Sequence, residues 1–358
     1  MEKEIILKAE SISKSFGGVK ALQNVSFELQ KGEVLSVIGE NGAGKSTLMK
    51  IVAGALKNDE GKIYFQGEEL SLHSPLDAVK TGISIVYQEP NIFADMSVLE
   101  NIFMGNETVS RGGTIQWTKM YDEAVEALRL VGLDGKILHL TMSELSIGNQ
   151  QLVLIARGIY KKCKVLILDE PTSILSHNES EKLFEIIADL KNKGVSIMYI
   201  SHRIPEILRI SDNIIVLRDG CLTGTLSPKE ISEETIITAM SGRKINMSVY
   251  KERKQSEKPI LEVKHLSLKP VYKDVSFDVR PGQILGMYGL VGAGRSEIAR
   301  AIFGETNAES GQIFFEGEDI SRININQAVE RRIFYVPEDR GAQGLFDIHS
   351  VRDNMSVA

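Results

Sequence analysis

The residues best suited to chemistry form a glycine-rich run that ends in a lysine and two hydroxyl residues. The run consists of Gly39, Glu40, Asn41, Gly42, Ala43, Gly44, Lys45, Ser46 and Thr47. Glycines at this spacing let consecutive backbone N–H groups turn toward phosphate oxygens, and a helix N-terminus behind them adds partial positive charge. Lys45 is expected to reach the β- and γ-phosphates, and Ser46 to ligate Mg²⁺. Since the strand-like VLSVI precedes the run and the helix-like STLMKIV follows it, the sequence predicts a loop that binds ATP.

Two adjacent carboxylates, Asp169 and Glu170, follow the apolar run KVLIL. An ionised group at the end of a buried strand is costly unless a cation lies nearby. Mg²⁺ would supply that cation, so Asp169 is predicted to face the metal and Glu170 to act as the general base that polarises a water. An acidic pair after a strand commonly caps a helix instead. The phosphate-binding loop upstream favours the catalytic interpretation.

The elements that must position these groups are short, β-branched apolar runs separated by helical patterns. The runs are residues 34–39, 164–169, 195–201 and 213–220. Such runs are typical of buried, mostly parallel strands joined by crossover helices, which is an α/β arrangement. Residues 119–132 have the apolar spacing of an amphipathic helix. Together with the stretch from about 92 to 160, they predict a helical insertion beside the sheet.

The sequence contains a tandem repeat. Residues 24–54 resemble residues 274–304 at an offset of 250 residues, and the same offset relates IVYQE, ending at Glu89, to YVPED at 335–339. A polar, charged stretch between the copies is typical of a linker. The predicted organisation is a first nucleotide-binding domain at 1–242, a linker at 243–258, and an incomplete second domain at 259–358.

Bulk properties limit the possible classes. A chain of 358 residues suits at least two domains, at roughly 100–200 residues each. No apolar run approaches the roughly 18 residues that span a bilayer, and the start of the chain lacks the pattern of a secretory signal, so the cytoplasm is predicted. A net charge of −6 gives no global attraction to nucleic acid. Cys163 and Cys221 are predicted to be reduced packing residues.

Three further motifs follow the loop in a characteristic order. Gln88 lies in VYQEP, residues 145–150 read LSIGNQ, and His202 lies in YISHR after a strand-like run. Alone, each has an ordinary alternative: a solvated glutamine, a helix start or a structural histidine. In this order and spacing the chain resembles the ABC ATPases. The resemblance implies an α/β P-loop NTPase fold, namely an ABC-type nucleotide-binding domain with a helical subdomain, followed by the N-terminal part of a second such domain.

The resemblance also implies roles for individual residues. Gln88 would lie near Mg²⁺ and the attacking water and report the nucleotide state to a permease, and His202 would contact the γ-phosphate. Ser146 and Gly148 would approach a γ-phosphate held by another domain. Phe16 would stack on adenine, although a core phenylalanine on a first strand is the alternative.

Some positions depart from the family pattern. Ile147 and Asn149 do so in the LSGGQ-like motif, and Ser176 stands where the family commonly has an aspartate, so an intersubunit aspartate contact is expected to be missing.

The second copy narrows the resemblance. Its loop runs from Gly289 to Ser296 with Arg295 in the lysine position, and VPEDR, which includes Glu338 and Arg340, replaces the glutamine motif. These features resemble the duplicated ATPases of monosaccharide and related autoinducer importers. A planar guanidinium need not reproduce the phosphate contacts of lysine, so a degenerate second site is expected. This copy also lacks about four residues in the region that holds Phe16 in the first copy.

The resemblance implies an ATP-hydrolysing importer subunit for a monosaccharide or similar molecule, peripheral on the cytoplasmic face of the membrane. Its partners would be integral membrane permease subunits, a second ATPase domain or subunit and, indirectly, a periplasmic or extracellular sugar-binding protein. Residues 91–105 would help to form the permease-docking cleft, or else be an ordinary buried helix. Because the second LSGGQ-like motif would fall beyond residue 358, efficient hydrolysis is expected to need a partner surface.

Two alternatives to this function remain. One is a soluble twin-domain ATPase that acts on the ribosome or DNA, which the short linker and negative charge disfavour. The other is an inactive, truncated ATP-binding remnant. Ribose, galactose, xylose and a furanosyl signalling molecule all remain possible cargoes.

Overall fold

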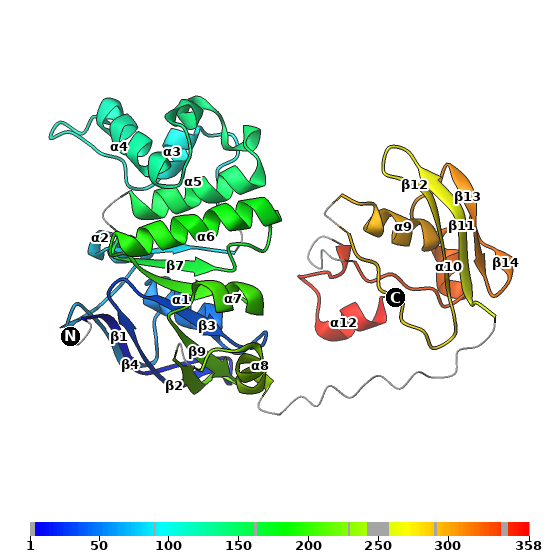
Figure 1. Ribbon diagram of the computed structural model, residues 1–358, viewed down its shortest axis with the longest axis horizontal. Helices are drawn as coiled ribbons and strands as arrows, with labels where there is room; N and C mark the ends of the chain where they lie inside the picture. Colours follow the sequence, from blue (N-terminus) through cyan, green and yellow to red (C-terminus); the bar gives the residue numbers. More distant parts are fainter. Residues whose placement is uncertain are drawn as a thin grey trace. The chain divides into compact units, whose positions relative to one another are not determined.

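The chain divides into two compact units, Met1–Asn246 and Met247–Ala358 (Figure 1). The computed structural model describes residues 4–88, 91–160, 163–227, 230–241, 258–289, 292–337 and 343–357. Residues 243–257 of the predicted linker lie outside the described residues. Each unit is therefore considered by itself.

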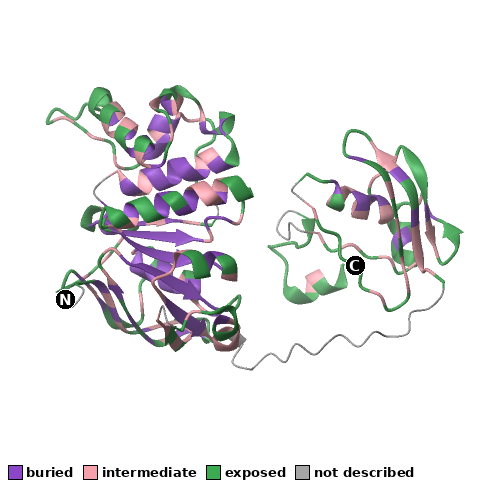
Figure 2. Ribbon diagram, in the orientation of Figure 1, coloured by how far each residue is buried: buried purple, intermediate pink, exposed green. Residues whose placement is uncertain are grey.

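A six-stranded sheet forms the centre of the first unit. Its order is β10 (Cys221–Leu226), β9 (Asn213–Arg218), β3 (Val34–Ile38), β8 (Ser196–Ile200), β7 (Val165–Asp169) and β6 (Ile83–Val86). Strands β9, β3, β8, β7 and β6 are parallel, and β10 is antiparallel to β9. Every residue of β3, β7 and β8 is buried (Figure 2). The predicted buried parallel sheet is confirmed, and its strands end at one common edge.

A second, antiparallel sheet lies in the same unit. Its order is β2 (Val19–Gln30), β1 (Ile5–Phe16), β4 (Glu60–Phe65) and β5 (Glu68–Glu69). Helix α1 (Lys45–Val52) contributes Leu48 and Met49 to a core shared with Leu7 of β1 and Val165 of β7. The helix that follows the glycine-rich loop is thus held by residues of both sheets.

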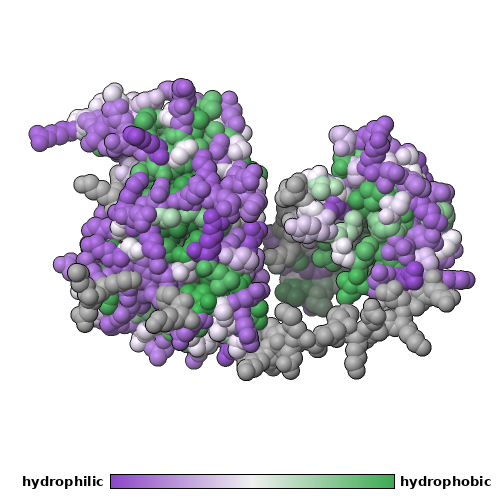
Figure 3. Space-filling view, in the orientation of Figure 1, coloured by the Kyte–Doolittle hydropathy of each residue, from purple (hydrophilic) through white to green (hydrophobic). Residues whose placement is uncertain are grey.

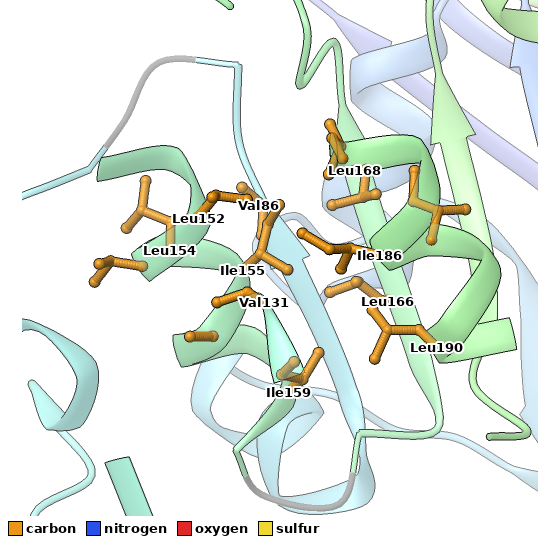
Figure 4. Packing of buried hydrophobic residues seen from close by; sticks show 14 of the residues in the cluster. Val86, Val131, Leu152, Leu154, Ile155, Ile159, Leu166, Leu168, Ile186 and Leu190 are labelled. Atoms are coloured by element: carbon orange, nitrogen blue, oxygen red, sulfur yellow. The ribbon is translucent and has the colours of Figure 1, made fainter. Parts of the chain in front are cut away.

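Helices complete the first unit. They are α2 (Pro75–Thr81), α3 (Val98–Phe103), α4 (Trp117–Leu130), η1 (Gly135–His139), η2 (Met142–Glu144), α5 (Ile147–Ile159), α6 (His177–Asn192), α7 (Ile204–Ile210) and α8 (Glu233–Ser241). The stretch from 92 to 160 is mainly helical, and α4 lies at the position of the helix expected at 119–132. Figure 4 shows Ile155 of α5 and Ile186 of α6 beside Val86 and Leu168 of the sheet. The helical insertion is therefore anchored to the sheet through α5.

The second unit repeats the antiparallel sheet. Its strands are β11 (Leu261–Leu268), β12 (Tyr272–Val279), β13 (Ser310–Phe315) and β14 (Glu318–Asp319), in the order β12-β11-β13-β14. Its helices are α9 (Arg295–Ile302), α10 (Ile325–Glu330) and α12 (Val351–Ser356). The strands of the first hairpin have 8 residues each, against 12 in β1 and β2. The shortening falls in the part of the hairpin where β1 carries Phe16.

The second unit differs from the first at its central strand. Residues 284–289 match β3 in the repeat but form no strand, and Ile284 is 82% exposed. In the first unit β8 and β9 flank β3 on both sides, and the described part of the second unit contains no counterpart of either strand. Among the described residues, this segment therefore lacks the two strands that pair with the backbone of β3 in the first unit.

Surface hydropathy and helix length indicate whether any part of the described chain could cross a membrane. Hydrophilic and hydrophobic residues are interspersed on the visible face of the first unit (Figure 3). Among the described residues, no helix is both long enough and apolar enough to cross a bilayer.

Candidate functional site

The glycine-rich loop has a backbone shape that only glycine adopts readily. Gly42 and Gly44 have φ values of 83° and 98°, in the left-handed region. A Cβ on Gly44 would lie 2.5 Å from the carbonyl oxygen of Ala21, whereas a Cβ on Gly42 would meet open space. Gly44 also precedes α1 without a side chain capping the helix. The first backbone N–H groups of α1 therefore remain available to an anion.

Lys45 lies buried beneath this loop. It is 6% exposed, and its Nζ donates to the carbonyl oxygens of Gly39 at 2.8 Å and Glu40 at 3.0 Å. Burial lowers the pKa of the ammonium, while the nearby carboxylates of Glu170 and Asp169 oppose that shift. The two hydrogen bonds thus fix the ammonium beneath the loop.

Asp169 at the end of β7 is a buried carboxylate next to the loop. Its pKa is raised by burial and by repulsion from Glu170, and lowered by a hydrogen bond from Ser46 and by Lys45. The Ser46 hydroxyl and the Asp169 carboxylate form a sparse oxygen donor set. Mg²⁺ is usually held in this way, by one or two protein oxygens together with substrate phosphates.

Glu170 links two other predicted residues. Its Oε2 accepts a hydrogen bond from Gln88 Nε2 at 3.0 Å, and its Oε1 lies 3.1 Å from Nδ1 of His202. Gln88 follows β6, Glu170 follows β7 and His202 follows β8, so the common edge of three adjacent parallel strands brings them together. The carboxylate is mostly buried, with 14% of its side chain exposed, while 56% of the His202 side chain is exposed. Glu170 can therefore accept a proton from a molecule bound at this edge.

Phe16 lies at the end of β1, where it pairs with Val19. Its side chain is 47% exposed, and Lys14 Nζ is 5.6 Å from its ring centroid. The following strand lies against the loop, because Ala21 limits the space at Gly44. The partly exposed ring is compatible with stacking and is not a core residue.

Ser146 and Gly148 lie apart from this cluster, at the start of α5. The Ser146 hydroxyl caps α5 by accepting from the Asn149 amide at 3.3 Å. Gly148 contacts the Glu179 carboxylate of α6, and Ser176, the position that departs from the family pattern, caps α6. Within the described chain these residues have helix-capping and packing contacts.

In the second unit Gly292 and Gly294 repeat the left-handed conformations, with φ values of 81° and 87°. Arg295 begins α9, and its Cδ would be 3.7 Å from a Cβ on Gly289. Residues 290 and 291 of this loop, together with Glu338 and Arg340, lie outside the described residues. The loop geometry is thus partly repeated around a different cation.

The sequence did not reveal one buried carboxylate near the site. Glu206 of α7 is 8% exposed and accepts hydrogen bonds from Thr172, Tyr199 and Ser201. The sequence signal was an acidic residue among the apolar residues of α7, four positions after His202. Such a residue is more commonly exposed.

The loop, the buried ammonium and the carboxylates at the strand edge define a nucleotide-binding protein of the P-loop class. A family model described as ABC transporter matches residues 22–173 and 272–357. The chain therefore belongs to the ABC transporter family, and parts of both repeat copies contribute to the match.

Relatives of similar sequence have names that refer to sugar import. The ribose import ATP-binding protein RbsA of Caldanaerobacter subterraneus subsp. tengcongensis is 41% identical over 355 residues, which are 99% of this chain and 71% of that protein. The protein of the same name from Clostridium tetani is 40% identical over 360 residues, 100% of this chain and 71% of that protein. An Agrobacterium fabrum protein named for ribose, galactose and methyl galactoside import is 42% identical over 355 residues, 99% of this chain and 69% of that protein.

Solved structures agree with the family. A crystal structure of the ADP conformation of an ATP-binding cassette of an ABC transporter is 29% identical, with a TM-score of 0.58, covering 67% of this chain and 99% of that one. A nucleotide-free cassette is 30% identical, with a TM-score of 0.57, covering 66% of this chain and 95% of that one. The predicted fold class, an ABC-type P-loop ATPase, is confirmed.

Proposed function

We propose that this chain is the ATP-hydrolysing subunit of an importer for ribose or a related monosaccharide, bound peripherally at the cytoplasmic face of the membrane. The observation that carries the catalytic part is the contact of Glu170 with Gln88 and His202 beside the glycine-rich loop. The cargo rests on the names of relatives that are 40–42% identical over nearly the whole chain.

The loop residues would hold ATP. Backbone N–H groups of residues 39–47 would surround the phosphates, Lys45 would neutralise their charge, and Phe16 would stack on adenine. Ser46, Asp169 and Gln88 would hold Mg²⁺ by oxygen atoms. Bound Mg-ATP would supply the phosphoanhydride bond that is cleaved.

Glu170 would orient and deprotonate the attacking water. Its carboxylate is mostly buried, and the hydrogen bond from Gln88 fixes one oxygen. His202 would help to orient the other oxygen and would donate to the phosphate through the ring nitrogen that does not face Glu170. Gln88 therefore connects the carboxylate to the segment after β6.

Membrane permease subunits would dock beside that segment. A cavity of about 200 Å³ lies there, lined by side chains that include Leu76, Tyr87, Asn91, Met104 and Arg157. Helix α3 is itself buried in the core, but residues on either side of it line the cavity. Residues 91–105 thus combine a buried helix with flanking residues that line the proposed docking cavity.

Arg157 suggests which charged group a permease segment would bring into this cavity. Among the described residues, its Nη2 donates a long hydrogen bond, 3.5 Å, to the Met104 carbonyl, and burial lowers the pKa of its guanidinium. It forms no ion pair with the residues that the structure describes. A permease segment that inserts a carboxylate among apolar side chains would complement this charge.

Ser146 and Gly148 would face the nucleotide of a second ATPase domain or subunit. Turnover would then depend on pairing. The principal experiment measures Mg-ATP binding and hydrolysis by the chain, alone and with permease, beside Lys45→Ala and Glu170→Gln variants. We expect ATP binding to weaken by about 10- to 100-fold in Lys45→Ala and turnover to disappear in Glu170→Gln. Absence of binding by the wild type would overturn the proposal.

The cargo is tested in vesicles containing the permease and its sugar-binding protein. We expect ATP-dependent uptake of labelled ribose in preference to xylose, abolished by Glu170→Gln. Stimulation of turnover by ribosomes or DNA, without an effect of permease, would favour the twin-domain alternative. Binding without turnover in the assembled complex would favour the inactive remnant.

A further inference from the structure

One buried carboxylate, that of Glu206, gathers hydrogen bonds from several separate segments. The Thr172 hydroxyl lies 2.8 Å from its Oε1 and 2.9 Å from its Oε2. The Tyr199 hydroxyl donates to Oε2 at 2.8 Å, and the Ser201 hydroxyl donates to Oε2 at 2.9 Å. Arg203 Nη1 donates to Oε1 at 3.3 Å. All these neighbours carry hydrogen atoms that they can donate to the carboxylate oxygens.

The donors belong to the two segments that carry the catalytic pair. Thr172 lies two residues after Glu170, and Ser201 immediately precedes His202. The Ser201 hydroxyl also accepts from the backbone N–H of Arg203 at 3.0 Å, so the residues on both sides of His202 are fixed. Glu206 therefore connects the backbone that bears Glu170 with the backbone that bears His202.

The connection lies in a solvent-excluded environment. Thr172 is 1% exposed, Ser201 2% and Tyr199 0%. Burial and the Glu206 carboxylate raise the pKa of the Tyr199 phenol, so it remains a donor at any working pH. In low-dielectric surroundings hydrogen bonds to a charged group are strong and directional. His202 itself is largely exposed, so its own packing does little to hold it.

We propose that Glu206 is a positioning residue, which keeps the Glu170 carboxylate and the His202 ring in contact by binding the segments that follow β7 and β8. It acts through Thr172 and Ser201 and touches neither catalytic side chain. The inference rests on the proposed ATPase function, in which that contact orients the attacking water. A role limited to stability is the competing explanation.

The test measures the coupling between the two catalytic side chains by NMR, without nucleotide. Histidine rings are labelled with ¹⁵N, and His202 is assigned among the 6 histidines with a His202→Asn variant. Glu170→Gln is expected to shift the His202 ring nitrogen signals, because Nδ1 faces this carboxylate. The size of that shift is then compared between the wild-type chain and chains altered around Glu206.

Three variants separate positioning from stability. Glu206→Gln removes the charge at nearly constant shape, and Thr172→Val removes the donor on the Glu170 side. Tyr199→Phe is the matched control, since it removes a donor to the same carboxylate from within β8 and releases neither segment. We expect the effect of Glu170→Gln on His202 to shrink in the first two variants and to persist in Tyr199→Phe.

Turnover of the assembled ATPase gives a second readout. Small displacements of catalytic groups cost up to about 100-fold in rate, so kcat should fall roughly 10- to 100-fold in Glu206→Gln and Thr172→Val. KM for ATP should be unchanged, because the glycine-rich loop is not altered. An unchanged coupling in Glu206→Gln, or equal losses in all three variants, would overturn the inference. Absence of turnover in the assembled wild-type ATPase would instead refute the proposed function, and the NMR comparison would still decide the role of Glu206.

Discussion

The carboxylate of Glu179 occupies the space that a side chain on Gly148 would need. A Cβ built on Gly148 would lie 1.9 Å from Glu179 Oε1 and 2.3 Å from its carboxyl carbon. The carboxylate is held in place, because its Oε2 accepts hydrogen bonds from the Ser176 backbone N–H at 2.9 Å and from the Ser176 hydroxyl at 2.8 Å. The small residue in the first turn of α5 is thus tied to the capping of α6.

Gly148→Ala is therefore expected to displace Glu179 and open the first turn of α6. Loss of the cap should lower local stability by about 1 kcal/mol, which corresponds to roughly fivefold faster amide exchange at Glu179 and Ser180. Hydrogen exchange followed by NMR measures this effect. Gly224→Ala is the control, since a Cβ there meets nothing within 4 Å. Unchanged exchange in α6 would show that the contact with Gly148 is not restrictive.

Glu170 has a backbone conformation that glycine would adopt more easily. Its φ is 46°, in the left-handed region, where a Cβ costs about 1–2 kcal/mol. Glu170→Gly should therefore have a free energy of unfolding about 1 kcal/mol higher than that of Glu170→Ala, as measured by urea denaturation. Both variants should abolish turnover. Glu181→Gly and Glu181→Ala in α6 are the matched pair, for which the order should reverse. Greater stability of alanine at both positions would contradict stored backbone strain at Glu170.

The two glycine-rich loops should differ in nucleotide binding. Lys45→Ala removes a buried ammonium aimed at the loop carbonyls, and loss of a charge-assisted contact weakens binding by about 10- to 100-fold. Arg295→Ala is expected to leave binding of a fluorescent ATP analogue unchanged. Equal losses in both variants would mean that the second loop is also a functional site.

The sequence could predict the parallel sheet because its strands are continuous apolar runs of 4–6 residues that no exposed helix would tolerate. The family resemblance assigned Gln88, Glu170 and His202 to one nucleotide site, and in the structure each of them follows one of these strands. The antiparallel sheet was not predicted, since β1 pairs with β2 and with the distant β4, and its half-buried strands resemble loops. The pairing of β1 with β2 and β4 became evident only from the three-dimensional structure.

Other parts of the site depend on contacts that local patterns do not encode. Glu206 receives donors from residues before it that lie on a strand and on two loops. The proximity of Gly148 to Glu179 joins two helices that are separated by β7. The family resemblance implied a nucleotide role for Ser146 and Gly148, whereas their capping and packing contacts required the three-dimensional structure.

Cys163 should be inert in the native protein. Burial raises its pKa from 9.0 to about 12, and its thiol donates to the Val165 carbonyl at 3.2 Å. A thiol reagent should label only Cys221 in the folded chain, and both cysteines in urea. Because the folded pKa is raised, stability contributed by the neutral thiol is full below pH 9 and is lost as pH rises toward 12. The free energy of unfolding should therefore decline more steeply over that range in wild type than in Cys163→Val.

A variant of Arg157 can distinguish an effect on permease docking from an effect on the stability of the fold. Arg157→Met keeps most of the apolar stem and removes a guanidinium that has no carboxylate partner among the described residues. Exchanging a poorly compensated, partly buried charge for an apolar group is often neutral or stabilising, so the melting temperature should be unchanged or higher. Loss of the contact with a permease carboxylate should weaken assembly by at least about 10-fold.

The weaker assembly of Arg157→Met with the permease can be measured in two ways: by pull-down of labelled permease, and by the stimulation of ATP turnover that the permease causes. Arg129→Met is the matched control, because it removes an exposed arginine near the end of α4 in the same helical insertion. Since it leaves the cavity charge in place, assembly should remain at the wild-type level. If Arg157→Met assembles equally well, the cavity does not bind a carboxylate. If it melts at a much lower temperature while Arg129→Met does not, the guanidinium is a structural group, and the permease must dock elsewhere.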